Sequence, residues 1–181
     1  MGWRRRNGDP FTLTSTPQVP GSTSAAGPGA DCSLVQEVSW ANQNQQRKWE
    51  IVRGFCGQIV EAAERQDLDP HLLAALIWWE SGGDQEAYSS SGAVGLMQVM
   101  PRDGLASSFE CGEDKYPCFA GRPTIEELKI PSFNISYGSN LLREKIEAGG
   151  SIREGLRLYG PRDVGYYYAD RIIELTEQVT P

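Results

Sequence analysis

The sequence has no apolar run that approaches the roughly 18 residues of a membrane-spanning helix. It has a single histidine, His71, and none of its four cysteines forms a Cys-x-x-Cys pair, so a zinc site of a common type is excluded. The formal net charge of −7 argues against nucleic acid as the main partner, because that binding depends on a basic surface. The arginines Arg4–Arg6 are placed as at the start of a signal peptide. No apolar stretch of about 7–15 residues follows them, so no signal or anchor is visible.

The 181 residues divide by composition into two parts. Glycine, proline, serine and threonine dominate residues 1–31, and such a segment cannot bury enough apolar surface to offset its ordering entropy. We therefore predict a flexible linker over residues 1–31 and one domain over residues 32–181. No internal repeat is visible.

Helical periodicity dominates the second part of the chain. Apolar residues recur at three- and four-residue steps from about residue 47 and predict one amphipathic helix: Trp49, Val52, Phe55, Cys56, Ile59 and Ala63. Asp69 followed by Pro70 predicts the start of a second helix that runs to about residue 81. That helix is apolar nearly all round, which is typical of a buried central helix, and Gly82 and Gly83 end it.

Further helices are predicted over residues 132–148, 151–159 and 163–179. Capping boxes are expected at Thr124 with Glu127 and at Ser151 with Glu154. Few alternating strand patterns occur, so the fold class is mainly α, with at most a short β-hairpin near residues 92–98.

One acid, Glu80, closes the apolar second helix. Leu72, Leu76 and Glu80 follow one another at four-residue steps and share one helix face. Desolvation and the negative end of the helix dipole would both raise the pKa of this acid. An acid that is still protonated near neutral pH can act as a general acid. The helix alone also permits a glutamate that reaches solvent at a frayed helix end.

The residues around Glu80 carry a resemblance to a known family. They are Glu80-Ser81-Gly82, Ser89, Gly95-Leu96-Met97-Gln98, Val99-Met100-Pro101, Asn134-Ile135-Ser136-Tyr137-Gly138 and Leu158-Tyr159-Gly160-Pro161. In this order and spacing they resemble the goose-type lysozyme and soluble lytic transglycosylase (SLT) superfamily, which cleaves the glycan strands of bacterial peptidoglycan. The resemblance covers about residues 49–179 and implies a lysozyme-like α domain.

The resemblance also implies roles for individual residues. Glu80 would be the catalytic acid, and the glycan would be bound by Ser89, Gly95, Met97, Gln98, Met100 and Tyr159. The hydroxyl of Tyr159 would face the acid, and Ser89 could bond either the acid or the sugar. Gly82 and Asn134 would be structural residues near the site. Ordinary core packing is the alternative for Tyr159 and the methionines, and we favour it for Trp40, Trp49, Trp78 and Trp79. Gly160 departs from the family pattern, which has asparagine there.

The family solution is a mechanism with one acid. Glu80 would protonate the oxygen between N-acetylmuramic acid and N-acetylglucosamine and then act as a base, so that a 1,6-anhydro product forms without metal or cofactor. Asp84 and Glu86 could supply a second carboxylate, although a solvated loop is their expected setting. The alternatives are hydrolysis, as in goose-type lysozymes, and a non-catalytic peptidoglycan-binding component of a secretion, conjugation or phage machine.

A protein directed at the wall would work outside the cytoplasm, secreted or in the cell envelope, with peptidoglycan glycan strands as its partner. We expect a monomer without stable membrane insertion. An oxidising exterior would favour disulfides, and of three possible pairings we predict Cys111–Cys118 and Cys32–Cys56. Four reduced cysteines are the alternative.

Overall fold

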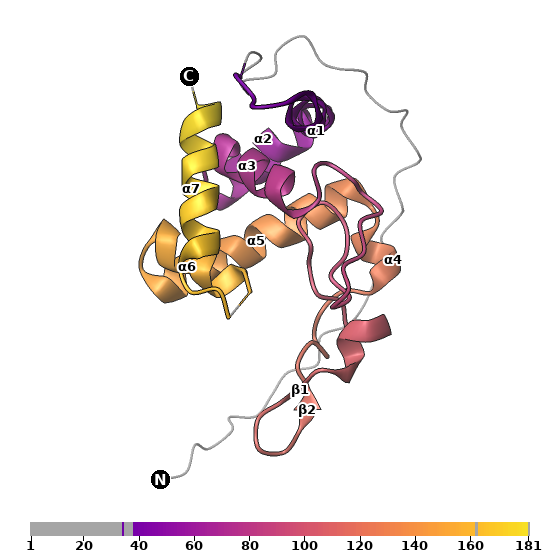
Figure 1. Cartoon of the computed structure of the whole chain (residues 1–181). Helices are drawn as coiled ribbons and strands as arrows, with labels where there is room; N and C mark the ends of the chain where they lie inside the picture. Colours follow the sequence, from indigo (N-terminus) through magenta and orange to yellow (C-terminus); the bar gives the residue numbers. More distant parts are fainter. Residues whose placement is uncertain (1–33, 35–37, 162, 181) are drawn as a thin grey trace, which may run out of the picture.

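A computed structural model describes residues 34, 38–161 and 163–180. Within them the chain is mainly helical, as predicted, and its elements are arranged as shown in Figure 1. The α-helices are α1 (Gln43–Arg53), α2 (Cys56–Gln66), α3 (Pro70–Glu80), α4 (Ile125–Leu128), α5 (Pro131–Gly149), α6 (Ile152–Tyr159) and α7 (Tyr167–Val179). A short 3-10 helix, η1 (Gly104–Ser108), precedes the strands β1 (Glu110–Cys111) and β2 (Tyr116–Pro117). The predicted linker over residues 1–31 lies outside the described residues.

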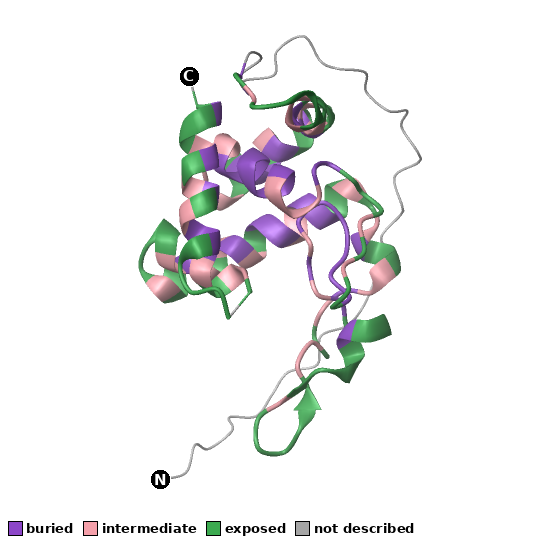
Figure 2. Ribbon diagram, viewed as in Figure 1, coloured by how far each residue is buried: buried purple, intermediate pink, exposed green. Residues whose placement is uncertain are grey.

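Helix α3 lies at the centre of the fold, as its composition predicts. Every residue from Leu72 to Trp78 is buried, and α1, α2 and α7 pack around them (Figure 2). The carboxylate of Asp69 accepts a hydrogen bond from the backbone N–H of His71 at 2.8 Å, so the predicted cap starts the helix. Gly82 follows the helix with a φ of +63°, a conformation that glycine adopts without strain.

The first predicted helix is two helices in the structure. Helix α1 ends at Arg53, and α2 begins at Cys56 after a turn in which the N–H of Phe55 donates to the carbonyl of Val52 at 2.9 Å. The apolar period continues across this turn, because Val52, Cys56 and Ile59 are all buried. Periodicity therefore could not reveal the break.

The C-terminal helices follow the sequence closely. Thr124 and Glu127 form the complete capping box of α4. Ser151 caps α6 by accepting from the N–H of Glu154 at 3.1 Å, while the carboxylate of Glu154 bonds Arg157 instead of completing the box. Helix α7 begins at Tyr167, four residues later than predicted.

The β-hairpin lies elsewhere than predicted. Strands β1 and β2 pair antiparallel, with Glu110 opposite Pro117, in an exposed arm that projects from the helices (Figures 1 and 2). Residues 88–99 include the 92–98 loop where we expected the hairpin, and they contain only isolated bridges between Tyr88 and Val94 and between Val94 and Val99. Turn chemistry explains the difference, because the disulfide-closed turn at residues 111–118 holds two strands together without an alternating apolar pattern.

The predicted Cys111–Cys118 disulfide is present, with an S–S distance of 1.97 Å. Cys56 is buried, but its predicted partner Cys32 lies outside the described residues, so that pairing stays a prediction. None of the helices in the described part has the length and apolarity that crossing a membrane requires.

Candidate active site

Glu80 is the last residue of α3, and buried apolar residues precede it on the same helix face. Leu72 and Leu76, which share its helix face, are 2% and 0% exposed. The side chain of Glu80 is only partly accessible, and desolvation raises the pKa of its carboxyl from 4.5 to about 7. A hydrogen bond from the hydroxyl of Tyr168 opposes this rise, because it stabilises the charged carboxylate. Glu80 is therefore an acid that titrates near neutral pH.

Tyr168, in the first turn of α7, is the direct partner of Glu80. Its hydroxyl donates to Oε1, which leaves Oε2 of the acid to carry the exchangeable proton. The ring is 4% exposed, and it occupies the space beside Gly160. A Cβ added at Gly160 would lie 2.4 Å from Cδ1 of Tyr168, so the ring can take this position only if residue 160 has no side chain.

Ser81 ties the end of α3 to the loop that follows. Its Oγ donates to the carbonyl of Leu96 at 2.9 Å and accepts from the N–H of Gly83 at 3.1 Å. The bond to Leu96 fixes the segment Gly95–Gln98 relative to Glu80, and the bond from Gly83 holds the turn after the helix. The sequence shows Ser81 within a motif but does not indicate this role.

Asn134, on α5, orders the same loop from the other side. It is fully buried, its Oδ1 accepts from the N–H of Met97 at 2.8 Å, and its Nδ2 donates to the carbonyls of Val94 at 3.0 Å and Leu128 at 2.8 Å. A Cβ on Gly95 would lie 2.3 Å from that Nδ2, so the glycine permits the close approach. This geometry favours the structural role that we expected for Asn134.

Tyr159 differs from its expected orientation. Its hydroxyl does not bond the acid but donates to the carbonyl of Met97 at 2.8 Å, and Tyr168 faces Glu80 instead. Tyr159 still lies within electrostatic range of the acid: burial raises the pKa of its phenol most, and the charge of Glu80 raises it further. The correction follows from helix geometry: α6 ends at Tyr159, whereas Tyr168 occupies the buried face of α7.

The predicted glycan-binding residues lie in the loop but differ in accessibility. Met97 is fully buried, and this favours packing over the sugar contact that we predicted. Gln98 is partly accessible; its Nε2 donates to the carbonyls of Ala87 and Gly95, and its Oε1 has no protein partner in the described part of the chain. Met100 is also partly accessible. The Oγ of Ser89 accepts from the N–H of Ala93 at 2.9 Å and shapes the loop rather than bonding the acid.

The candidate second carboxylates point into solvent. Asp84 and Glu86 are exposed, Asp84 accepts from the N–H of Glu86 at 2.9 Å, and Glu86 lies 3.8 Å from the ammonium of Lys129. This is the solvated loop that we expected. Within the described residues, no group of three or more His, Cys, Asp or Glu side chains is placed to hold a metal ion.

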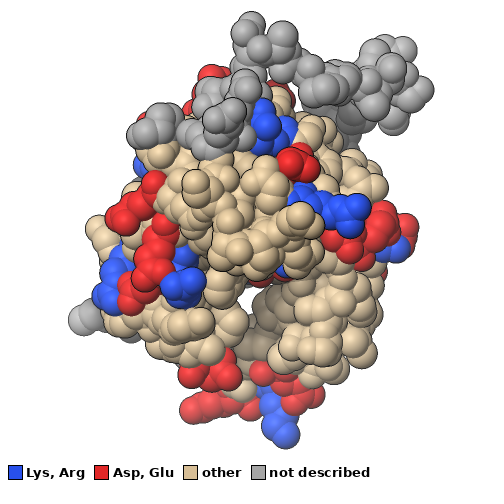
Figure 3. All heavy atoms as spheres, turned by 45° about the horizontal axis from the view of Figure 1, so that its top comes forward, with Lys and Arg blue, Asp and Glu red and all other residues tan. Residues whose placement is uncertain are grey.

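The surface is hollowed between two lobes (Figure 3). One lobe contains α6 and α7, and the other contains the loop that follows α3, while mainly uncharged residues form the facing walls. Glu80 lies where the lobes meet, because α3 leads directly into the loop and Tyr168 reaches the acid from α7. A cleft with mainly uncharged walls and an acid that titrates near neutral pH is suited to a long uncharged polymer.

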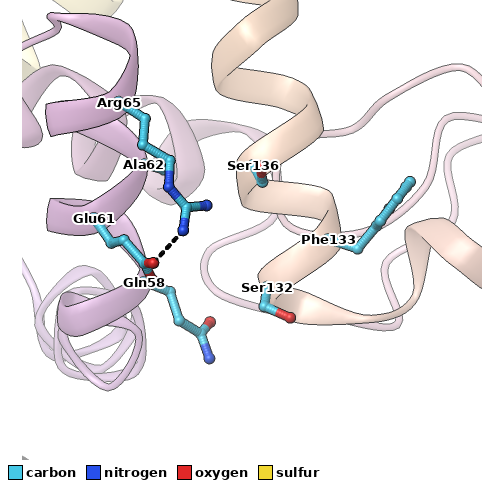
Figure 4. A pocket seen from close by; sticks show the side chains of 7 residues that line it. All are labelled: Gln58, Glu61, Ala62, Arg65, Ser132, Phe133 and Ser136. Atoms are coloured by element: carbon cyan, nitrogen blue, oxygen red, sulfur yellow. Dashed lines mark hydrogen bonds and ion pairs between the residues drawn. The ribbon is translucent and has the colours of Figure 1, made fainter. Parts of the chain in front are cut away.

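Two further hollows lie elsewhere on the molecule. A hollow of about 500 Å³ is bordered by Trp40, Trp78 and Trp79. Trp49 and Trp78 belong to the buried core, and Trp40 and Trp79 are partly buried and pack against it, as we favoured. A second hollow, of about 370 Å³, lies between α2 and α5 (Figure 4). Glu61 and Arg65 pair across its α2 wall, and Phe133 points away from that wall.

Residues 57–159, more than half of the chain, match the family model described as the Transglycosylase SLT domain. The chain belongs to this family. The match to the Transglycosylase SLT family includes Glu80, the Gly95–Gln98 segment, Asn134 and Tyr159, whereas Tyr168 lies beyond it. Sequence reasoning missed Tyr168 as a site residue, although its spacing from Ile172 would have placed it on the buried face of the last helix.

Two relatives of this SLT domain are named for their activity. The chain is 43% identical over 77 residues to the endo-type membrane-bound lytic murein transglycosylase A of Klebsiella pneumoniae, over 41% of this chain and 34% of that protein. The same figures hold for the protein of that name from Salmonella paratyphi B. The chain thus spans about a third of the length of these relatives. A solved structure, an inactive mutant of the lytic transglycosylase Slt from Pseudomonas aeruginosa, is similar with a TM-score of 0.46 and 23% identity, over 68% of this chain and 22% of that chain.

Proposed function

We propose that this protein is a peptidoglycan lytic transglycosylase that cleaves the β-1,4 bond between N-acetylmuramic acid and N-acetylglucosamine. The observation that carries the proposal is the pKa of Glu80, which burial raises to about 7 at the base of a neutral cleft in an SLT domain. The names of the relatives, which are lytic murein transglycosylases, support the same substrate class. Such enzymes act on the cell envelope, which is where we place this chain.

In the first step, the protonated Glu80 donates its proton to the glycosidic oxygen. The bond from that oxygen to C1 of the muramic sugar breaks, and an oxocarbenium-like state forms. The hydroxyl of Tyr168 stabilises the carboxylate that results, because its hydrogen bond to Oε1 favours the charged form.

In the second step, the carboxylate of Glu80 takes the proton from the C6 hydroxyl of the same sugar. The C6 oxygen closes on C1 and gives the 1,6-anhydro product, so that no water is consumed and the acid is regenerated. The nucleophile is part of the substrate, and this tethering replaces a positioned water. One carboxyl suffices for both transfers, which accords with the exposure of Asp84 and Glu86.

Product analysis on purified sacculi tests the proposal. Wild-type protein should release muropeptides lighter by one water than the products of hydrolysis, and mass spectrometry distinguishes the two. Glu80→Gln should lower the rate by about 10²–10⁴-fold, the usual contribution of a general acid. Products with the mass of hydrolysis would identify a lysozyme instead. Undiminished activity in Glu80→Gln would exclude Glu80 as the acid.

A further inference from the structure

Arg122 is held between two aromatic rings beside the candidate active site. Its guanidinium carbon lies 5.9 Å from the ring centre of Phe119 and 6.0 Å from that of Tyr137. The two rings come from different parts of the fold, because Phe119 follows the disulfide arm and Tyr137 belongs to α5. Contacts of this kind attract the cation to the ring faces and orient its planar head.

Both rings are themselves supported. Phe119 packs edge-on against Phe109 with ring centres 6.0 Å apart, and the N–H of Cys118 donates to the carbonyl of Phe109 at 2.8 Å. The Cys111–Cys118 disulfide closes this arm covalently. Tyr137 stacks on Phe133 with ring centres 6.1 Å apart. The two rings that contact Arg122 are therefore held in place by their own packing and by the disulfide-closed arm.

The support joins directly to the active-site loop. Gly138, next to Tyr137, packs closely on Met97. A Cβ added to Gly138 would lie 2.6 Å from the Sδ of Met97. The carbonyl of Met97 accepts the hydrogen bond of Tyr159. The positive charge of Arg122 acts to lower the pKa of the Tyr159 phenol, against the larger effect of burial, which places the guanidinium within electrostatic range of the site.

Arg122 has no carboxylate partner in the described part of the chain, unlike several other arginines. Arg143, Arg153, Arg157 and Arg171 each form an ion pair with an aspartate or glutamate. Arg122 thus offers a fork of N–H donors within electrostatic range of Tyr159, in a protein whose net charge is −7. A fork of this geometry matches a carboxylate, which it can bind through two parallel hydrogen bonds.

We propose that Arg122 binds a carboxylate on the side arm of the muramic sugar while the glycan occupies the cleft. This inference rests on the proposed function. The sugar rings of the glycan are uncharged, so the side arm is the part that can present a carboxylate. Two sources share this chemistry: the lactyl group of a strand without peptide, and the peptide stem of a substituted strand. Arg122 would therefore select for the charge of the side arm, whereas Glu80 cleaves the glycan.

The test compares soluble glycan strands of one length that differ only in the side arm. One set carries peptide stems, a second has been stripped by an amidase to free the lactyl carboxylate, and both are also prepared with their carboxylates converted to neutral amides. The measured quantity is the ratio of kcat/KM for each charged strand to that for its amidated counterpart. This ratio is insensitive to a uniform loss of activity.

Wild-type protein should prefer charged strands about tenfold, the factor that about 1.4 kcal/mol of differential binding produces. Arg122→Gln should bring the ratio to one, and Arg122→Lys should restore part of it, because lysine keeps the charge but not the fork. Arg102→Gln is the matched control. It removes the same charge from the same segment, but the charge of Arg102 acts on Glu127 instead of the site tyrosines, so the ratio should be unchanged.

A preference that survives in Arg122→Gln, or a wild-type ratio of one, would overturn the inference. Preference on stripped strands identifies the lactyl carboxylate as the ligand, and preference confined to substituted strands identifies the stem. If Arg122→Gln cleaves none of the strands, binding replaces cleavage as the measurement. The Kd values of charged and amidated strands are then compared for Glu80→Gln and for the double variant Glu80→Gln, Arg122→Gln. Failure of wild-type protein to cleave any strand would instead refute the proposed function.

Discussion

Replacing Glu80 by glutamine should change how folding depends on pH. The pKa of Glu80 is about 7 in the folded protein, against an ordinary value of 4.5 that we assign to the unfolded chain. The folded state keeps its proton over this range while the unfolded state releases it, so the contribution of Glu80 to stability is full below pH 4.5 and is lost as the pH rises through 7. The difference between the two pKa values corresponds to about 3 kcal/mol of unfolding free energy.

Glutamine has no proton to lose, so Glu80→Gln should have nearly the same stability as wild type at pH 4. It should exceed wild type by about 3 kcal/mol at pH 8. Urea unfolding followed by tryptophan fluorescence between pH 4 and pH 8 measures this difference. Working with the difference cancels acids that titrate in the opposite sense, such as Glu154, whose partners lower its pKa to about 2.

Glu64→Gln is the matched control, because Glu64 is an exposed residue of α2. Its stability relative to wild type should vary by less than about 0.5 kcal/mol over the same pH range, as for an ordinary surface substitution. A pH-independent difference between Glu80→Gln and wild type would show that the acid is well solvated in the folded protein. It would remove the physical basis for the raised pKa and for general acid catalysis.

Three further predictions concern the surroundings of Glu80. The activity of wild type should fall about tenfold per pH unit above about pH 7. Tyr168→Phe should move this decline to higher pH, because it removes the hydrogen bond that favours the carboxylate of Glu80. A rate that does not change with pH would contradict both expectations. Gly160→Ala should cost roughly 1–3 kcal/mol by urea unfolding, as the ring of Tyr168 is displaced, while Gly57→Ala, with nothing within 4 Å of its added Cβ, should cost nothing. Asn134→Ala should cost roughly 3 kcal/mol or more in the same assay, because three buried backbone groups lose their partner; a loss below 1 kcal/mol would mean that the loop orders itself.

The centre of the fold could be predicted from local chemistry. Asp69 and Pro70 mark the start of α3, glycines mark its end, and an apolar surface on all sides requires burial. A glutamate at the end of such a helix has few ways to reach bulk water, so both the position and the raised pKa of Glu80 follow from the sequence. Thr124 and Glu127 form their capping box because both partners lie within one helical turn.

The rest depends on contacts between residues that are far apart in the chain. Tyr168 and Glu80 are 88 residues apart, and the pattern of α7 shows that the tyrosine is buried but not which group its hydroxyl meets. The bonds from Asn134 to Val94 and from Tyr159 to Met97 depend equally on how α5 and α6 pack on the loop. Sequence periodicity predicts which face of a helix a residue occupies. Which faces contact each other is decided by how the helices pack.

Gly160 illustrates how such a pairing accommodates a departure from the family pattern. An asparagine side chain at this position could not coexist with the observed ring of Tyr168, since even a Cβ would lie 2.4 Å from it. The glycine therefore allows α7 to bring a phenol to Glu80 from the side of the cleft opposite the loop that Ser81 and Asn134 hold. A larger residue at 160 would have to move either the ring or the start of α7. Glycine at 160 and tyrosine at 168 are thus coupled, and an asparagine at 160 alone would disturb the hydrogen bond between Tyr168 and Glu80.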